Sequence, residues 1–225
     1  MSDFLRPLVI VPAAGFGRRV GSPESKEMLL REDGSYLIDF ALDWARENEC
    51  RCLVLTRKEK KNLIDYLNAK SKQQDLQISI VSETRDWPET LLLSAPYWQK
   101  WNLVFLPDMS FEPRSALKDG LTLFKQNQSQ VENEPDLIVW SHEISEARSS
   151  WGYILSEGPH KLHLAEKPKQ DRRGRAWGLY AFQSTIGLDL LRAQAASNRD
   201  HEWKMLALKC KEVFLESFRD LTRGQ

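Results

Sequence analysis

Cysteine is scarce in this chain of 225 residues, which contains only Cys50, Cys52 and Cys210. The number is odd, and neither a C-x-x-C pair nor a Cys/His spacing typical of zinc sites occurs. This pattern predicts small buried thiols in a reducing cytosol, so we expect a cytoplasmic protein.

An excess of charge is also missing, because Lys plus Arg and Asp plus Glu each number 32. We therefore expect no nucleic-acid or membrane partner, and any anion-binding site must be local. Long apolar runs are missing too. The stretch that ends at Gly15 is short, is interrupted by Pro12 and lacks a basic start, so we expect neither a transmembrane helix nor a signal peptide there.

The residues that are present have an ordinary globular balance, with 41% hydrophobic and 28% charged. Up to His142, apolar strands alternate with amphipathic helices. The predicted strands are 7–14, 51–56, 76–82, 102–108 and 136–142, and the predicted helices are 35–49, 58–71, 88–100 and 115–127. Ser35 is the predicted N-cap of the first helix. The alternation predicts a mainly parallel sheet with helices on both faces.

After His142 the pattern changes to short strands with fewer helices. The predicted strands are 151–157, 161–168, 176–183 and 212–218, and the predicted helices are 186–196 and 201–211. No linker-like segment divides the chain. We therefore predict one α/β domain over 1–225, a three-layer sandwich with a mixed, mainly parallel central sheet. Its halves are 1–142 and 143–225.

Two features lie at the carboxyl ends of predicted strands, where open parallel sheets bind their ligands. One is the loop after the first strand, with Gly15, Gly17, Arg19 and Lys26. The other is Asp108, at the end of the apolar stretch "LVFLPD". An aspartate can hold a hard cation, and the cations of the facing loop can hold the phosphates that share it. The pattern predicts a triphosphate site.

Other glycine-rich phosphate loops fit this segment less well. "GFGRRVG" differs from the dinucleotide fingerprint by one residue and does not lead directly into a helix. "GSPESK" lacks the second glycine of a Walker loop. A nicotinamide-dependent oxidoreductase is therefore the least favoured hypothesis.

The stretch "AAGFGRRVGSPESKEML" resembles the signature of the sugar-phosphate nucleotidylyltransferases, in which A-A/G-G-x-G-x-R is followed by a lysine and an apolar pair. Further stretches follow in the family's order: "FLPDMSF", "WGYIL" with "AEKP", and "WGLYAFQ". The resemblance runs from residue 9 to about residue 183. It implies a glycosyltransferase-A-like nucleotidyltransferase fold, similar to that of glucose-1-phosphate thymidylyl- and uridylyltransferases.

The resemblance implies that residues 1–142 bind the nucleotide. Arg19 would neutralise the β- and γ-phosphates, and Lys26 would stabilise the α-phosphate and the departing pyrophosphate. Asp108 would bind Mg²⁺. The implied nucleotide contacts near the first loop are Ala13, Ala14, Gly15 and Gly17.

The second half, 143–225, is implied to hold the sugar phosphate. Glu166 would accept hydrogen bonds from sugar hydroxyls, and Lys167 would bind the phosphate of the sugar. Gly152 and Gly178 would allow close backbone contact with the sugar.

Three positions depart from the family pattern. Ser25 precedes the lysine, where the family often has proline. Thr90 stands where a base-reading glycine is expected, so the base is left open. The second-metal motif W-x-D-x-G-T is missing, and its nearest relative, "FRDLTRG", makes Asp220 the candidate second carboxylate.

The resemblance, together with Arg19, Lys26 and Asp108, leads us to expect a magnesium-dependent nucleotidyltransferase. Its partners would be a nucleoside triphosphate and a sugar 1-phosphate, and its products an NDP-sugar and pyrophosphate. The nucleophile is already an anion, so no general base is required. A CTP-dependent cytidylyltransferase with a non-sugar phosphate acceptor remains open, as does a non-catalytic nucleotide-binding relative. The sequence leaves the oligomeric state open.

Overall fold

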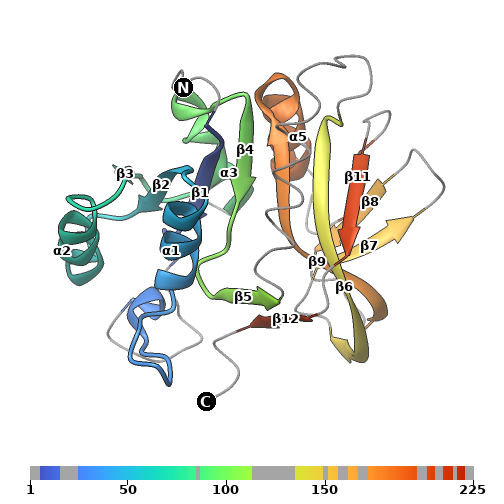
Figure 1. Ribbon diagram of the computed structural model, residues 1–225. Helices are drawn as coiled ribbons and strands as arrows, with labels where there is room; N and C mark the ends of the chain where they lie inside the picture. The colour runs from blue at the N-terminus through green and yellow to red at the C-terminus, as the bar shows by residue number, and fades with distance from the viewer. Residues whose placement is uncertain are drawn as a thin grey trace. The chain divides into compact units, whose positions relative to one another are not determined.

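The computed structural model describes the structure of most residues of the chain (Figure 1). The described residues are 6–15, 25–84, 87–112, 135–148, 152–156, 162–166, 172–196, 202–205, 210–214 and 217–220. The chain forms two compact units. The N-terminal unit is Met1–Ser110 with Arg219–Gln225, and the C-terminal unit is Phe111–Phe218. The division into halves at residue 142 stays a prediction.

The N-terminal unit is built on four parallel strands in the order β3-β2-β1-β4. They are β1 (Leu8–Pro12), β2 (Arg51–Thr56), β3 (Leu76–Ile80) and β4 (Trp101–Val104). Ile10 of β1 lies opposite Leu53 on one side and Val104 on the other. Continuous apolar runs of this kind are typical of strands that are covered on both faces.

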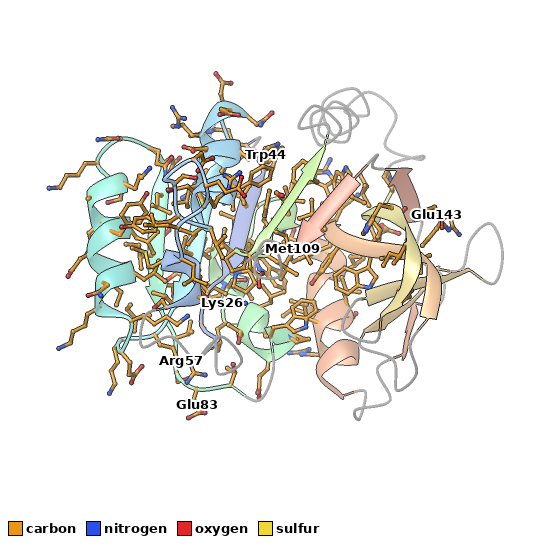
Figure 2. The ribbon with its side chains drawn as sticks, turned by 90° about the horizontal axis from the view of Figure 1, so that it is seen from below. Lys26, Trp44, Arg57, Glu83, Met109 and Glu143 are labelled. Carbon is orange, nitrogen blue, oxygen red and sulfur yellow. The ribbon has the colours of Figure 1, made fainter. Side chains whose placement is uncertain are left out.

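Helices cover both faces of this sheet, as predicted. They are η2 (Lys26–Met28), α1 (Asp39–Glu47), α2 (Lys61–Lys70), α3 (Trp87–Leu92) and η3 (Ala95–Tyr97). Figures 1 and 2 show α1 and α3 on opposite sides of β1. Trp44 of α1 is 1% exposed and packs against Phe105, which follows β4. No helix in the part of the chain that the structure describes is long and apolar enough to cross a membrane.

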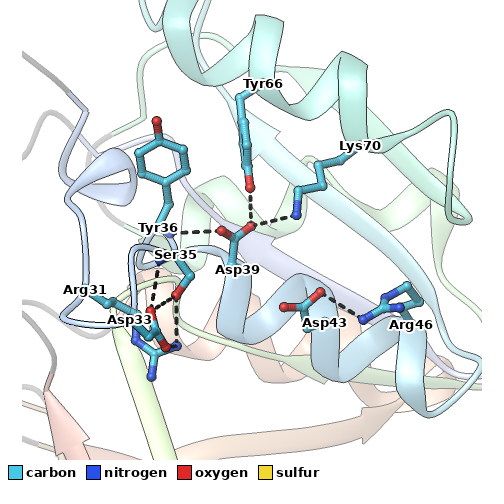
Figure 3. A network of polar contacts seen from close by, with 9 residues as sticks. All are labelled: Arg31, Asp33, Ser35, Tyr36, Asp39, Asp43, Arg46, Tyr66 and Lys70. Atoms are coloured by element: carbon cyan, nitrogen blue, oxygen red, sulfur yellow. Dashed lines mark hydrogen bonds and ion pairs between the residues drawn. The ribbon is translucent and has the colours of Figure 1, made fainter.

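The first helix begins later than predicted, because Ser35 is not its N-cap. Residue Ile38 is the N-cap of α1, and Ser35 instead hydrogen-bonds to Asp33 through its backbone N–H at 2.9 Å. The turn contains Gly34 with φ +80°, a conformation that favours glycine. Figure 3 shows Asp39, in the first turn of α1, accepting hydrogen bonds from the backbone N–H of Tyr36 and from the Tyr66 hydroxyl.

The strand order creates a switch point between β1 and β4. The chain proceeds from β1 to β2 and β3 in one direction and then crosses to β4 on the other side of β1. The segments that leave β1 and β4 therefore start side by side at the carboxyl edge. This is the position at which open α/β sheets bind their ligands.

The C-terminal unit has mostly antiparallel strand pairs. Its elements are β6 (Leu137–Arg148), β7 (Gly152–Ser156), β8 (Leu162–Glu166), β9 (Arg172–Gln183), α5 (Ser184–Ala196), β10 (Glu202–Met205) and β11 (Cys210–Phe214). The antiparallel pairs are β10–β8, β8–β7, β7–β9 and β9–β6, whereas β11 is parallel to β6. The predicted α/β class with a mixed sheet and flanking helices is confirmed.

The predicted helix 201–211 is wrong, because its described residues, 202–205 and 210–211, lie in strands. Residues Glu202–Met205 pair with Leu162–Ala165 of β8, and β11 pairs with the start of β6. The apolar residues Trp203 and Met205 also fit the period of two that is typical of a strand. The sequence therefore suits a helix or a strand, and pairing with neighbouring strands favours the strand. The predicted strand 212–218 is divided between β11 and β12 (Ser217–Asp220). The predicted helix 115–127 lies outside the described residues.

Candidate functional site

Lys26 and Asp108 meet at the switch point. The Lys26 ammonium, at the start of η2, donates a hydrogen bond to Asp108 Oδ2 at 2.7 Å. The two residues are 82 positions apart in the chain. Their side chains are 24% and 19% exposed, so both groups remain within reach of a ligand. The two charges that the sequence placed at one sheet edge therefore lie in direct contact.

A buried ion pair lies directly beside Lys26. Glu27, the next residue of η2, is 0% exposed, and its Oε2 lies 2.8 Å from the Lys60 ammonium. The same ammonium donates a hydrogen bond to the Ala13 carbonyl at 2.8 Å. Burial lowers the pKa of Lys60, although the Glu27 carboxylate opposes this effect. Lys60 thus connects the strand end before the glycine loop with the short helix that carries Lys26.

Arg57 adds another cation at this edge. It follows β2, its side chain is 8% exposed, and its Nη1 lies 3.9 Å from Glu83 Oε1 beyond β3 (Figure 2). The positive charges of Lys26 and Arg57 both lower the pKa of Lys60, so the three cations act on one region. A local group of cations at the carboxyl edge suits an anionic ligand in a chain with no net charge.

Several other predicted nucleotide residues are described. Ala13 and Ala14 are buried, and a Cβ added at Gly15 would find no atom within 4 Å. Thr90 is buried in α3, and its hydroxyl lies 2.5 Å from that of Thr84. Gly17 and Arg19 lie outside the described residues.

The predicted sugar-side glycines have structural roles in the C-terminal unit. Gly152 lies opposite Trp177, and a Cβ at Gly152 would lie 2.2 Å from Trp177 Nε1. Gly178 is the extra residue of a bulge in β9, because Trp177 pairs with Ser141 and Leu179 with Trp140. Bulges redirect strands and are enriched beside active sites. The contact of Gly152 and Gly178 with a sugar stays a prediction.

The remaining predicted residues are placed only in part. Glu166 ends β8 and Asp220 ends β12. The strand β12 pairs with β5 (Met109–Glu112), which begins directly after Asp108. Lys167 lies outside the described residues.

The chemistry of Asp108 fits a magnesium ion. Within the described ranges, no three or more His, Cys, Asp or Glu side chains gather as a metal-binding group. Magnesium does not require such a group, because it is usually held by one or two carboxylates together with substrate phosphates and water. The partly exposed Asp108 carboxylate beside the cation group could provide one such ligand.

Three residues of the edge were missed by the sequence analysis: Glu27, Arg57 and Lys60. Lys60 lies within the amphipathic helix predicted over 58–71, and Glu27 lies within the stretch that resembles the family signature. The sequence contained one indication for Arg57 and Lys60. Both follow closely after the predicted strand 51–56, at its carboxyl end, where open parallel sheets bind their ligands.

The sheet order, with its switch point between β1 and β4, defines an open α/β type of fold. Solved structures share this fold. They confirm the predicted fold, which is that of the sugar-phosphate nucleotidyltransferases. A protein assigned as a glucose-1-phosphate thymidylyltransferase of Bacillus anthracis, crystallised with sucrose, matches with a TM-score of 0.73 and 13% identity. The match covers 96% of this chain and 90% of that one.

Two further structures give similar values. The structure titled mannose-1-phosphate geranyltransferase of Thermus thermophilus has a TM-score of 0.66 and 16% identity, with 96% of this chain and 76% of that chain covered. HddC of Yersinia pseudotuberculosis has a TM-score of 0.67 and 15% identity, with 96% and 93% covered. No protein-family model and no curated protein sequence matches the chain. The likeness is therefore one of fold.

Proposed function

We propose that this protein is a magnesium-dependent nucleotidyltransferase that joins a nucleoside triphosphate to a sugar 1-phosphate. The observation that carries the proposal is the 2.7 Å contact between Lys26 and Asp108 at the switch point of the sheet. It brings together a cation that can bind phosphate and a carboxylate that can bind a metal ion. Phosphoryl-transfer sites depend on this combination of charges and on positioning.

The chemistry follows from these groups. An oxygen of the sugar phosphate attacks the α-phosphorus of the triphosphate, and the bond from that phosphorus to the β-phosphate oxygen breaks. Pyrophosphate takes the electrons of that bond and leaves. Lys26, and Arg19 from the glycine loop, would stabilise the negative charge on the transferring and departing groups. No side chain has to remove a proton, because the attacking oxygen is already an anion.

Asp108 would hold Mg²⁺, which supplies positive charge to the triphosphate and orients its oxygens. In the structure, Lys26 and Asp108 neutralise each other. Substrate binding would give each of them a partner of opposite charge: phosphate for Lys26 and the metal ion for Asp108. Asp220 is proposed as a second carboxylate, and Glu166 and Lys167 as the groups that hold the sugar phosphate.

A pyrophosphate-release screen tests this proposal. Each of ATP, GTP, CTP, UTP and dTTP is combined with a panel of sugar 1-phosphates, with Mg²⁺ present or removed by chelation. Phosphocholine and polyol phosphates with CTP are included, because they identify a cytidylyltransferase with a non-sugar acceptor. Magnesium-dependent release with one sugar phosphate supports the proposal. Nucleotide binding without release from any pair would instead indicate a non-catalytic relative.

A further inference from the structure

Glu27 is a carboxylate removed from water beside the proposed catalytic lysine. It is 0% exposed, and among the described residues its Oε1 has no hydrogen-bond partner. Its backbone carbonyl accepts a hydrogen bond from the Ile38 N–H at 3.2 Å, just before α1. A buried carboxylate is costly unless an opposite charge pairs with it, and Lys60 is the partner that the structure provides.

The position of Lys60 does not serve its own helix. Lys60 is the N-cap of α2, where it makes no side-chain cap hydrogen bond, and the first turn contains no acidic residue. A lysine there opposes the helix dipole and has no oxygen to accept the N–H groups of the first turn. Its ammonium reaches back 47 residues to Ala13 and 33 residues to Glu27. Residues that depart from the usual N-cap and helix-dipole preferences in this way are expected at functional sites.

We propose that Glu27 and Lys60 are positioning residues for the phosphate-binding groups, an inference that rests on the proposed function. Their ion pair joins η2 to the start of the loop after β1, through the Lys60 hydrogen bond to the Ala13 carbonyl. The Ala13 N–H is held in turn by the Leu55 carbonyl of β2 at 2.8 Å. One buried contact thus connects the end of β1, where the glycine loop begins, with the short helix that carries Lys26.

This arrangement fixes Lys26 before the substrate arrives. Lys26 and Glu27 are consecutive residues of a three-residue helix, so movement of one displaces the other. A displacement of about 1 Å at a reacting group can reduce the rate by roughly 100-fold. The pair therefore acts on the reaction through Lys26 and the chain that leaves β1 at Ala13, without contact with the substrate.

The test must separate positioning from folding. The variant Lys60→Met leaves Glu27 buried without its cation, so both melting temperature and turnover should fall. The double variant Glu27→Met/Lys60→Met removes both charges, and replacement of a buried ion pair by apolar side chains of similar volume is often neutral for stability. We expect it to recover most of the melting temperature but to keep a kcat about 10- to 100-fold below wild type. Lys61→Met, the same change at the exposed neighbouring residue, should leave both quantities unchanged.

A second readout is the affinity for inorganic pyrophosphate, measured by calorimetry without any acceptor. The double variant should bind pyrophosphate more weakly than wild type, whereas Lys61→Met should bind it equally well. A double variant with wild-type kcat and wild-type pyrophosphate affinity overturns the proposal. If wild type binds pyrophosphate but shows no turnover, the proposed reaction fails while the affinity comparison still decides the role of the pair. If wild type does neither, both proposals fail.

Discussion

At the scale of single residues, Lys26 is the most informative position. Lys26→Ala should lower kcat by roughly 100- to 1000-fold, because it removes a positive charge from the place where negative charge develops. The ion pair with Asp108 is partly exposed, so its loss should cost only about 0–1 kcal/mol of folding free energy. Steady-state kinetics and a thermal melt measure both effects. Unchanged turnover in a folded variant would remove Lys26 from the proposed site.

Asp108 is the residue on which the metal proposal depends. Asp108→Asn keeps the shape of the side chain but removes its charge, so Mg²⁺-dependent turnover should collapse while the fold survives. Direct binding of Mn²⁺, followed by electron paramagnetic resonance in the presence of a triphosphate, should weaken as well. Asp220→Asn is the matched comparison and should be milder, because its motif departs from the family pattern. A fully active Asp108→Asn variant with an unshifted magnesium optimum would contradict the metal assignment.

At the scale of secondary-structure elements, substitution by alanine should lower the stability of the protein at one glycine and leave it unchanged at another. Gly152→Ala brings a methyl group into the buried indole of Trp177, across the β7–β9 pair, and should lower the free energy of unfolding by about 1–3 kcal/mol. Gly15→Ala places its methyl group in open space, so stability should stay within about 0.5 kcal/mol.

Urea unfolding of both variants measures these changes. The nucleotide Michaelis constant provides the second comparison. It should rise for Gly15→Ala, because the new methyl group would stand where the loop backbone approaches the triphosphate. A Gly152→Ala variant as stable as wild type would show that the Trp177 side chain can move to accommodate the methyl group at little cost.

The strand β6 contains a buried histidine that should make folding sensitive to acid. Burial lowers the pKa of His142 to about 4, from an ordinary value of 6.5. Above pH 6.5, the histidine is neutral in both the folded and the unfolded chain and contributes no pH dependence. Between pH 6.5 and 4 the unfolded chain takes up the proton and the folded chain does not, so stability falls.

The loss from His142 should reach about 3 kcal/mol near pH 4 and should level off below it, once the folded chain also takes up the proton. Urea unfolding at steps from pH 7.5 to 4, for wild type and His142→Gln, isolates this contribution from that of the carboxylates. The variant should show a shallower decline over this window. Equal slopes would mean that the folded chain accepts the proton on His142 without cost.

Elements with continuous apolar sequence were predictable, and elements that depend on partners were not. The runs that became β1 and β2 are buried on both faces and have few alternatives. The segment 201–211 has apolar residues that suit a helix or a strand, and the neighbouring β8 and β6 made it β10 and β11. Glu27 and Lys60 look like solvent-exposed charges, because only the folded chain brings residues 33 positions apart into one buried pair.

At the scale of the whole molecule, the predicted site residues divide between the two units. The nucleotide candidates and Asp108 belong to the N-terminal unit, which also includes Asp220, whereas Gly152, Glu166 and Gly178 belong to the C-terminal unit. We expect the N-terminal unit to bind the nucleotide and the C-terminal unit to bind the sugar phosphate. This expectation leads to a prediction about which backbone amides each substrate protects.

Hydrogen exchange should show two different patterns of protection. A triphosphate with Mg²⁺ should slow exchange mainly at β1, β4 and η2, and a sugar 1-phosphate mainly at β7 and β9. A ligand at 100 times its Kd stabilises the bound state by about 2.7 kcal/mol, so amides that exchange through opening of the bound region should slow by roughly 100-fold. Lys167→Ala should weaken only the sugar-phosphate pattern, since its predicted role is to hold that phosphate. Protection of the N-terminal unit alone by both ligands would contradict the division of roles and would move the acceptor site to the same unit as the nucleotide.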